Sequence, residues 1–373
     1  MSSQLRVSLV CEQLLQAVPG GIGTYVRAML TALPRAGVIV EPVTALHRAH
    51  DLADAGLSHA RRLPLPRDAL YRRWLRGGRP GVGGKASIVH APSLAFPRRD
   101  GRPLVVTVHD LMFLEHVEAY TKRGHEFHTQ ALDRLSEADL VIVPSKATEQ
   151  AVLALDDAPA RVRVVAMGTD MQAPSEADTN AVLARLEVEQ PYVLWVGTVE
   201  PRKNPEGVVR GFVEAVMSGV PRAEEMNLYL AGPPGWWSGE VRELVTERGL
   251  ADRVRRIGEV ARADLPALYA GAEAFVFPSF GEGFGLPVLE AMACGCPVVT
   301  SNVSSLPEVA GSAAELCDPN DVSSIGEALA KVLRDRELAH DLSRLGLRRA
   351  KDFTWERTGL ATAACYREVL ASA

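Results

Sequence analysis

Two carboxylates, Glu282 and Glu290, stand in the segment of this chain that is richest in groups able to bind a ligand. The segment runs from Pro278 to Met292 and reads Pro-Ser-Phe-Gly-Glu-Gly-Phe-Gly-Leu-Pro-Val-Leu-Glu-Ala-Met. Glycine lets backbone amides approach a ligand closely, and the start of a helix favours phosphate. Ionised carboxylates accept strong, directional hydrogen bonds from sugar hydroxyls. The segment therefore predicts a site for a phosphorylated sugar, with the two carboxylates bound to different sugar rings.

Two adjacent cations, Arg202 and Lys203, lie in the sequence Gly-Thr-Val-Glu-Pro-Arg-Lys-Asn at residues 197–204. This sequence follows an apolar run that predicts a strand and precedes a predicted helix. The planar fork of arginine and the point charge of lysine both suit a diphosphate. The alternative is a solvated loop with two exposed cations.

A histidine and a carboxylate, His109 and Asp110, end the apolar run Val-Thr-Val-His-Asp. Catalytic groups collect at the carboxyl ends of parallel strands, where we expect His109 to lie. A single histidine is often structural, but this position favours a function.

Two glycine-rich loops look like phosphate sites. Gly20-Gly21-Ile22-Gly23 opens a predicted helix, whose free amides suit an anion. It is a near miss of the dinucleotide fingerprint, but the third glycine is missing and the loop lies well beyond the strand, which argues against NAD or FAD. A plain turn is the other alternative. Residues 81–87 resemble a P-loop, but Ala86 stands where the magnesium-binding hydroxyl belongs, so that interpretation is rejected.

Short apolar runs alternate with helical stretches along all 373 residues, which is typical of buried parallel strands. We expect strands at 6–11, 38–44, 87–90, 104–109, 140–143 and 162–166, and a second series at 192–196, 228–231, 254–257, 274–277 and 297–300. We expect helices at 22–33, 123–137, 147–155, 205–217 and 240–248. Two such series predict two doubly wound α/β domains that face each other across a cleft. The polar interval 168–190 is the expected linker.

The composition is that of an ordered protein with two cores. Hydrophobic residues make up 47% and the formal net charge is -5, which excludes disorder over most of the length. No apolar run approaches the ~18–20 residues needed to span a bilayer. The five cysteines form no CxxC pair, so we expect reduced, buried thiols in a cytoplasmic protein rather than a zinc or redox site.

Cations crowd the segment between Arg61 and Arg102, which suggests an anionic partner. Residues 67–76 can form a helix with Leu70, Trp74 and Leu75 near one face and arginines beside it. Such a helix suits the surface of an anionic membrane, or an acceptor carried on a lipid pyrophosphate. A solvated arginine face is the alternative. Nucleic acid is disfavoured, because the segment lacks interleaved aromatic residues on which bases stack.

Taken together and in this order, the motifs resemble those of the family 4 retaining glycosyltransferases, which have the GT-B fold. The resemblance covers nearly the whole chain. It implies two Rossmann-like α/β domains with the active site in the cleft between them. Residues 1–172 would form the acceptor domain, residues 173–354 the nucleotide-sugar donor domain, and residues 355–373 a helix that crosses back to the first domain.

The resemblance also implies a role for each motif. His109 would approach the transferred sugar, and Arg202 and Lys203 would bind the diphosphate and stabilise it as the leaving group. Glu282 would hold sugar hydroxyls and Glu290 the ribose hydroxyls. Gly21 would place its amide near the diphosphate, and Val260 would lie where members of the family hold the base with backbone groups. The amides of Gly283, Phe284, Gly285 and Leu286 would assist Glu282. Thr198 is the remaining donor-binding residue that the resemblance implies.

We therefore expect a retaining hexosyltransferase that moves mannose from GDP-mannose to a saccharide or lipid-linked acceptor in cell-envelope glycan or glycolipid synthesis. The chain has no Asp-x-Asp triplet, so we expect no metal and no cofactor, with Arg202 and Lys203 taking the place of a divalent ion. We expect front-side attack, since no carboxylate is an obvious covalent nucleophile. The alternatives are a glucosyl- or N-acetylglucosaminyltransferase that uses a UDP-sugar, a nucleotide-sugar epimerase, and a non-catalytic nucleotide-sugar binder. Peripheral attachment to the inner face of the cell membrane stays open.

Overall fold

The computed structural model describes residues 4–233 and 239–372, and the chain divides into two compact units. Unit 1 comprises Met1–Gly168 together with Thr354–Ala373, and unit 2 comprises Thr169–Phe353. The expected domain limits, after residues 172 and 354, lie close to these boundaries.

Unit 1 is built on a seven-stranded sheet in the order β3-β2-β1-β4-β5-β6-β7, in which every neighbouring pair is parallel. The strands are β1 (Arg6–Val10), β2 (Ile39–Thr44), β3 (Arg61–Arg62), β4 (Ile88–Ala91), β5 (Leu104–Thr107), β6 (Leu140–Val143) and β7 (Val162–Val164). The central strands β4, β5 and β6 are buried along their whole length, as their continuous apolar sequences predict. Strand β3 was not expected, because two arginines make no apolar run.

Unit 2 is built on a six-stranded parallel sheet in the order β10-β9-β8-β11-β12-β13. The strands are β8 (Tyr192–Val196), β9 (Asn227–Ala231), β10 (Val254–Gly258), β11 (Ala274–Phe277), β12 (Val298–Ser301) and β13 (Glu315–Cys317). The short strand β13 was missed. The two parallel sheets confirm the prediction of two doubly wound α/β domains.

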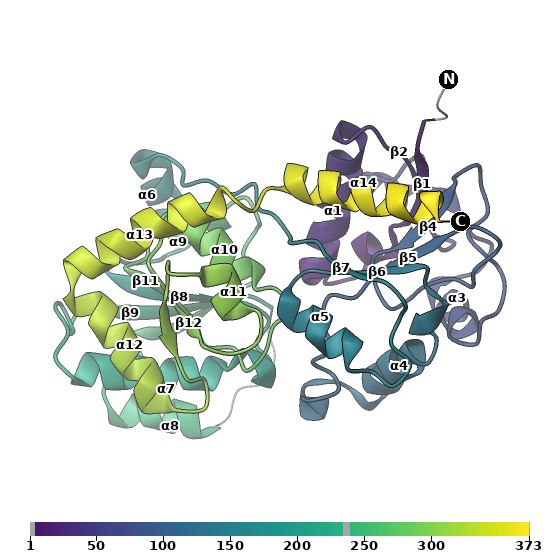
Figure 1. Cartoon of the computed structure of the whole chain (residues 1–373). Coiled ribbons are helices and arrows are strands. Elements are labelled where there is room, and N and C mark those ends of the chain that lie inside the picture. The colour runs from purple at the N-terminus through teal and green to yellow at the C-terminus, as the bar shows by residue number, and fades with distance from the viewer. Residues whose placement is uncertain (1–3, 234–238, 373) are drawn as a thin grey trace. The chain divides into compact units, whose positions relative to one another are not determined.

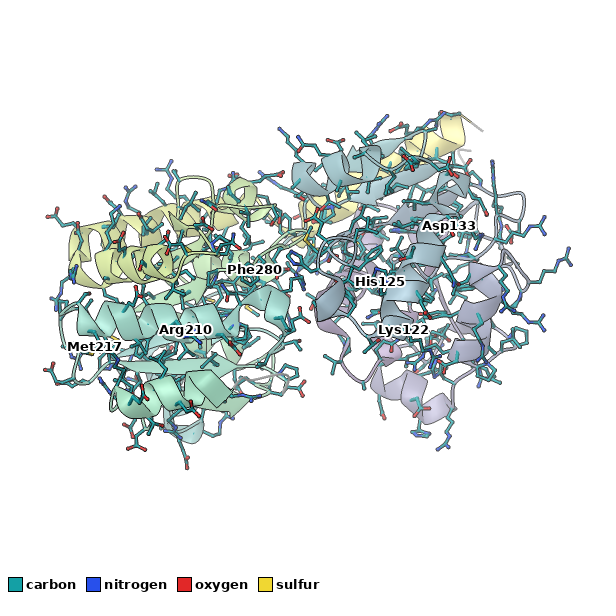
Figure 2. The ribbon with its side chains drawn as sticks, turned by 90° about the horizontal axis from the view of Figure 1, so that it is seen from below. Lys122, His125, Asp133, Arg210, Met217 and Phe280 are labelled. Carbon is teal, nitrogen blue, oxygen red and sulfur yellow. The ribbon has the colours of Figure 1, made fainter. Side chains whose placement is uncertain are left out.

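Unit 1 also contains helices, most of which lie between its strands, while the last one lies at the end of the chain. They are η1 (Glu12–Leu15), α1 (Gly20–Arg35), α2 (Ala49–Asp54), α3 (Arg67–Leu75), η2 (Val117–Ala119), α4 (Lys122–Leu132), η3 (Leu135–Glu137), α5 (Lys146–Leu153) and α14 (Trp355–Ala371). The single helix expected at 123–137 is wrong, because α4 ends at Leu132 and η3 follows as a separate turn. Figure 2 marks Lys122, His125 and Asp133 along α4 and just beyond its end.

Unit 2 has its own set of connecting helices. They are α6 (Glu176–Arg185), η4 (Pro201–Lys203), α7 (Pro205–Met217), α8 (Gly239–Glu247), α9 (Leu265–Gly271), α10 (Leu286–Ala293), α11 (Leu306–Ala310), α12 (Val322–Arg334) and α13 (Arg336–Ala350). Figure 2 shows α7 with Arg210 near its middle and Met217 at its end.

The linker expected at 168–190 is wrong over most of its length. Its polar, acidic sequence forms α6, whose first turn is capped by Ser175 accepting a hydrogen bond from the Asp178 amide. Leu183 and Thr179 are buried on the inner face of α6, which packs on α9. Acidic residues in the first turn stabilise a helix, so the acidic residues that suggested a linker are in fact a helix-start signal.

The last helix, α14, belongs to unit 1 and lies along α1 (Figure 1). The two helices approach closely at Gly359, where a Cβ atom would lie 2.7 Å from Ala32 Cβ. A buried polar chain adds a second attachment. The Tyr366 hydroxyl lies 2.6 Å from His90 Nδ1, and His90 Nε2 lies 2.8 Å from Thr107 Oγ1. The C-terminal segment is therefore part of the core of unit 1.

Helix α3 forms as expected, but its apolar face is not free. Leu70 and Trp74 are each 1% exposed and belong to the hydrophobic core of unit 1, and Trp74 Nε1 donates to the Pro80 carbonyl at 2.8 Å. The expectation that these residues form a membrane-contacting face is wrong, because the hydrophobic core of unit 1 already covers them. Over the described residues, no helix is both long and apolar enough to cross a membrane.

The five cysteines are free and buried, which confirms the prediction of core thiols. Burial raises the pKa of Cys11 to about 12, so its thiol stays protonated at neutral pH.

Candidate active site

The strand order of unit 2 places two loops side by side. β8 and β11 are neighbours at the point where the order of the strands reverses, and ligands of such sheets bind beyond the carboxyl ends of the strands at this point. The loop after β8 contains Thr198, Arg202 and Lys203. The loop after β11 runs from Pro278 to Gly285 and includes Phe280, labelled in Figure 2. Topology thus brings together the two strongest sequence motifs.

Arg202 joins these two loops. Its Nη1 donates to the Gly281 carbonyl at 2.5 Å and lies 3.0 Å from Glu282 Oε1, while Nη2 donates to Glu200 Oε1 at 2.7 Å. The backbone strengthens the connection, since the Phe280 amide donates to the Arg202 carbonyl at 2.9 Å. Both ends of the guanidinium therefore contact protein oxygens, and Arg202 orients Glu282.

Three serines hold Glu282 in addition. Ser279 Oγ donates to Glu282 Oε1 at 3.1 Å, the Glu282 amide donates to Ser304 Oγ at 3.0 Å, and Ser305 Oγ donates to the Glu282 carbonyl at 2.8 Å. Ser304 and Ser305, which belong to the loop between β12 and α11, were not expected at the site. Ser279 thus helps Arg202 to orient the carboxylate, while Ser304 and Ser305 hold the backbone of Glu282.

Glu282 is ionised at neutral pH. Burial by itself raises the pKa of this carboxyl, but the positive charges of Arg202 and Lys203 outweigh it and hold the pKa below its ordinary value. An oriented, charged carboxylate accepts strong hydrogen bonds, which suits sugar hydroxyls.

Lys203 lies at the end of η4, with Nζ 5.8 Å from the centroid of the Phe277 ring. Its stem passes Gly197, where a Cβ atom would lie 3.0 Å from Lys203 Cδ. The following residue, Asn204, adopts a left-handed conformation and caps α7 by accepting from the Gly207 amide at 3.0 Å. This cap fixes the backbone next to Lys203 and places its cation at the carboxyl edge of the sheet.

The start of α10 presents backbone amides. Gly285 is its N-cap with φ of 103°, and a Cβ atom there would lie 2.6 Å from Leu306 Cδ2. Among the described residues, the backbone N–H groups of Phe284, Gly285 and Leu286 donate no hydrogen bond. Free amides at a helix N-terminus suit an anion, and the neighbouring Gly283 is buried in the same turn.

Glu290 lies one turn into α10 and is 5% exposed. Its Oε1 accepts from Arg262 Nη1 at 2.9 Å, and its Oε2 accepts from the Tyr269 hydroxyl at 3.5 Å. Burial raises the pKa of Glu290 above its ordinary value, although Arg262 opposes the shift. Arg262 was not expected at the site. The available signal was its position two residues after Val260, in the loop that follows β10.

A surface pocket of about 480 Å³ lies beside this pair. It is lined by Asp170, Met171, Gln172, Arg262, Ala263 and Pro266. Arg262 connects the pocket to Glu290, because its Nη2 lies 3.3 Å from Asp170 Oδ1 while Nη1 contacts Glu290. Val260, half-buried, belongs to the same loop as Arg262.

In unit 1, Gly21 lies exposed in the first turn of α1. The loop needs its glycines, because a Cβ atom at Gly23 would lie 2.3 Å from Pro19 Cβ, and Gly20 has a φ of 59°. The first turn of this long helix therefore offers backbone N–H groups to an anion.

His109 lies just beyond β5, which ends at Thr107 rather than at 109 as expected. Its Nε2 lies 3.0 Å from the Pro92 carbonyl and therefore carries the proton, and its ring packs edge-on against Tyr25 at 5.1 Å. Nδ1 is buried without a hydrogen-bond partner in the part of the chain that the structure describes. Burial lowers the pKa of His109 to about 4, so the ring is neutral near pH 7.

Comparison with known proteins shows the family of this chain. Residues 19–173 match the Glycosyltransferase Family 4 description, and residues 181–349 match Glycosyl transferases group 1. The O-antigen chain mannosyltransferase B of Escherichia coli is 38% identical over 292 residues, which cover 76% of this chain and 74% of that protein. A D-inositol 3-phosphate glycosyltransferase of Salinispora tropica is 30% identical over 365 residues, which cover 90% of this chain and 74% of that protein. The chain belongs to these glycosyltransferase families and is a glycosyltransferase.

Solved structures confirm the GT-B fold. Sucrose-phosphate synthase from Thermosynechococcus elongatus matches 99% of this chain and 100% of its own with a TM-score of 0.74 at 24% identity. WaaG, a glycosyltransferase involved in lipopolysaccharide biosynthesis, matches 96% of this chain and 99% of its own, with a TM-score of 0.71 at 16% identity.

Proposed function

We propose that this glycosyltransferase moves mannose from GDP-mannose to a saccharide or lipid-linked acceptor, with retention of the anomeric configuration. The observation that carries the proposal is the ionised Glu282, oriented by Arg202 beside the cation of Lys203 and the amides at the start of α10. Two relatives support mannose as the sugar. They are the mannosyltransferase B named above and the serotype-specific mannosyltransferase WbdA of Escherichia coli, 30% identical over 262 residues.

The reaction needs charge stabilisation at the leaving diphosphate. Lys203 and the free amides near Gly285 supply it, and preorganised donors of this kind are worth several kcal/mol in the transition state. Glu282 holds sugar hydroxyls, Glu290 holds the ribose, and Gly21 adds an amide at the diphosphate. Thr198, in the loop of Lys203, completes the donor contacts. No metal or cofactor enters this scheme.

The acceptor attacks the face from which the diphosphate leaves. Its hydroxyl oxygen bonds to the anomeric carbon as the bond from that carbon to the β-phosphate oxygen breaks, and the hydroxyl proton passes to the departing phosphate. Neutral His109 lies beside the transferred sugar in this scheme. Holding both reactants in place removes much of the entropic barrier.

A UDP-sugar is the second candidate donor. The observation in its favour is a structure of HepE from Anabaena in complex with UDP-glucose, which shares this fold with a TM-score of 0.72 at 18% identity.

A thermal-shift panel separates the donors, because a ligand that binds the folded state raises the melting temperature by mass action. GDP-mannose and GDP should stabilise the protein more than UDP-glucose, UDP-N-acetylglucosamine and UDP. Larger shifts with the UDP compounds would overturn GDP-mannose. NMR of the products then decides retention and separates transfer from epimerisation, which returns an altered nucleotide sugar without an acceptor.

We also propose peripheral attachment to an anionic membrane through the basic segment. With Leu70 and Trp74 buried, the attraction rests on charge alone, and Arg72, Arg73 and Arg76 are exposed. Each basic residue near an anionic surface contributes roughly 1 kcal/mol, which salt screens. The protein should co-sediment with phosphatidylserine vesicles but not neutral ones, and less so after all three arginines are changed to Gln. Equal recovery in the supernatant with both vesicles at low salt would contradict this.

A further inference from the structure

The pocket beside Glu290 combines apolar walls with a polar edge. Met171, Ala263 and Pro266 line it together with a carboxylate, a guanidinium and an amide, which come from Asp170, Arg262 and Gln172. At about 480 Å³ it is roomy enough for a nucleobase. A nucleobase has two flat apolar faces and an edge of hydrogen-bonding groups, which matches this lining.

Arg262 divides its two terminal nitrogens between two carboxylates. Nη1 contacts Glu290 at 2.9 Å and Nη2 contacts Asp170 at 3.3 Å. The Glu290 side chain is 7% exposed, whereas that of Asp170 is 75% exposed. Asp170 therefore has carboxylate surface open to a ligand, and Arg262 links it to Glu290, the acid proposed to bind the ribose.

The bases differ in what they offer to such a pair. Guanine carries two neighbouring donors, N1–H and the exocyclic N2 amino group, next to the O6 acceptor. A carboxylate can accept from both donors and a guanidinium can donate to O6, and both hydrogen bonds are charge-assisted. Uracil has one N–H between two carbonyl oxygens. A carboxylate that accepts from this N–H is repelled by the carbonyl oxygens on either side. Adenine offers an acceptor where guanine offers N1–H.

We propose that Asp170 and Arg262 select guanine as the base of the donor. Asp170 accepts from N1–H and the N2 amino group, and Arg262 donates to O6 while its contact with Glu290 keeps that carboxylate in place for the ribose. This assignment rests on the proposed function, because it names the base of the donor nucleotide.

The test is the affinity of the full chain for GDP, IDP and UDP by titration calorimetry. IDP is GDP without the N2 amino group, so it isolates one hydrogen bond. The wild-type protein should prefer GDP over IDP roughly tenfold, the value of a hydrogen bond to a charged group, and should bind UDP more weakly. Asp170→Asn and Asp170→Ala should remove the preference for GDP over IDP, and Asp170→Glu should restore part of it. Asp252→Asn is the matched control, because this exposed carboxylate precedes β10 at the opposite edge of the sheet.

The ratio between nucleotides separates base recognition from a structural role. If the Asp170 variants weaken all three nucleotides equally, or keep the wild-type ratio of GDP to IDP, the proposal is overturned. A transfer assay with GDP-mannose distinguishes the two levels. If Asp170→Asn loses the preference for GDP but the wild-type protein transfers no mannose from GDP-mannose, the base assignment holds and the proposed function is wrong. Transfer together with an unchanged ratio would do the reverse, and a wild-type preference for UDP would overturn both.

Discussion

Arg202 and Glu282 form an ion pair with 3.0 Å between Nη1 and Oε1, although their loops follow two different strands of unit 2. Both side chains are little exposed, at 11% and 12%. The fork of Arg202 also contacts Glu200 and the Gly281 carbonyl, so it fixes the geometry of both loops. In this arrangement Arg202 positions Glu282, and Lys203 is the cation that we propose acts on the diphosphate.

Replacing Arg202 with lysine should therefore impair catalysis even though the charge is kept. A lysine ammonium cannot replace the planar guanidinium in its three contacts with Glu200, the Gly281 carbonyl and Glu282. We expect kcat/KM to fall roughly ten- to hundredfold, in line with the loss of one or two charge-assisted hydrogen bonds. Steady-state kinetics on a variant with wild-type circular dichroism checks this. Activity within twofold of wild type would show that the fork has no role in orienting Glu282.

Lys203→Ala should reduce kcat by about 10² to 10³, the usual effect of removing one preorganised group at a developing anion. Lys331→Ala is the matched control, because this exposed lysine pairs with Glu315 at the start of β13, at the edge of the sheet opposite the site, and should leave kcat unchanged. Saturating donor concentrations separate the effect on turnover from the effect on binding. An equal kcat for the two variants would remove Lys203 from the mechanism.

Gly285→Ala should destabilise the fold and disturb the start of α10. Its φ is 103°, and a Cβ atom would lie 2.6 Å from Leu306 Cδ2. Gly219→Ala is the comparison, because Gly219 has a φ of 79° with no atom within 4 Å of the added Cβ. Positive φ alone costs about 1 kcal/mol or more, so the clash should make the Gly285 variant the less stable of the two in urea unfolding. Equal unfolding free energies would contradict the packing described for this turn.

The buried histidines of unit 1 should make stability fall with acidification. Burial lowers the pKa of His90 to about 3 and that of His109 to about 4. In the unfolded chain both bind a proton near pH 6.5, at about the ordinary value. Below that pH the unfolded state binds more protons than the folded state. The contribution of the two histidines to the unfolding free energy should therefore be fully present above about pH 6.5 and should be lost as the pH falls toward 4.

His90→Gln should make that decline shallower, because one of the two histidines no longer titrates. Urea unfolding at pH 7.5, 6 and 5 measures the slope, and the comparison of slopes holds even if the variant is less stable at every pH. Identical slopes for the two proteins would show that His90 is not kept neutral by the fold.

The alternation of apolar runs was enough to predict most of both sheets. β8, β11 and α7 begin and end where expected, because each is a long or fully buried stretch with clear flanking signals. β3 and β13 could not be predicted, since short edge strands need little apolar surface and take their pairing from the neighbouring strand.

The site shows the same division. Residues 197–204 and 278–292 could be recognised locally, because each motif is continuous in sequence and lies directly after a strand. The contacts of Arg262 with Asp170 and Glu290 could not, since they join three segments whose proximity arises only from the fold. Trp74 shows the opposite error, because a helix face rich in apolar residues looks the same in sequence whether membrane or core covers it.

The most direct test of the account is product formation from GDP-mannose with mannose-terminated oligosaccharides as acceptors, comparing wild type with Glu282→Ala. GDP release is followed in time, and NMR identifies the sugar linkage formed. We predict a new α-linked mannose and GDP in equal amounts from wild type, and a rate lower by two orders of magnitude or more in a variant that is still folded. A folded Glu282→Ala variant that transfers mannose at the wild-type rate would contradict the site, and a wild-type protein that forms no mannoside while transferring another sugar would contradict the donor.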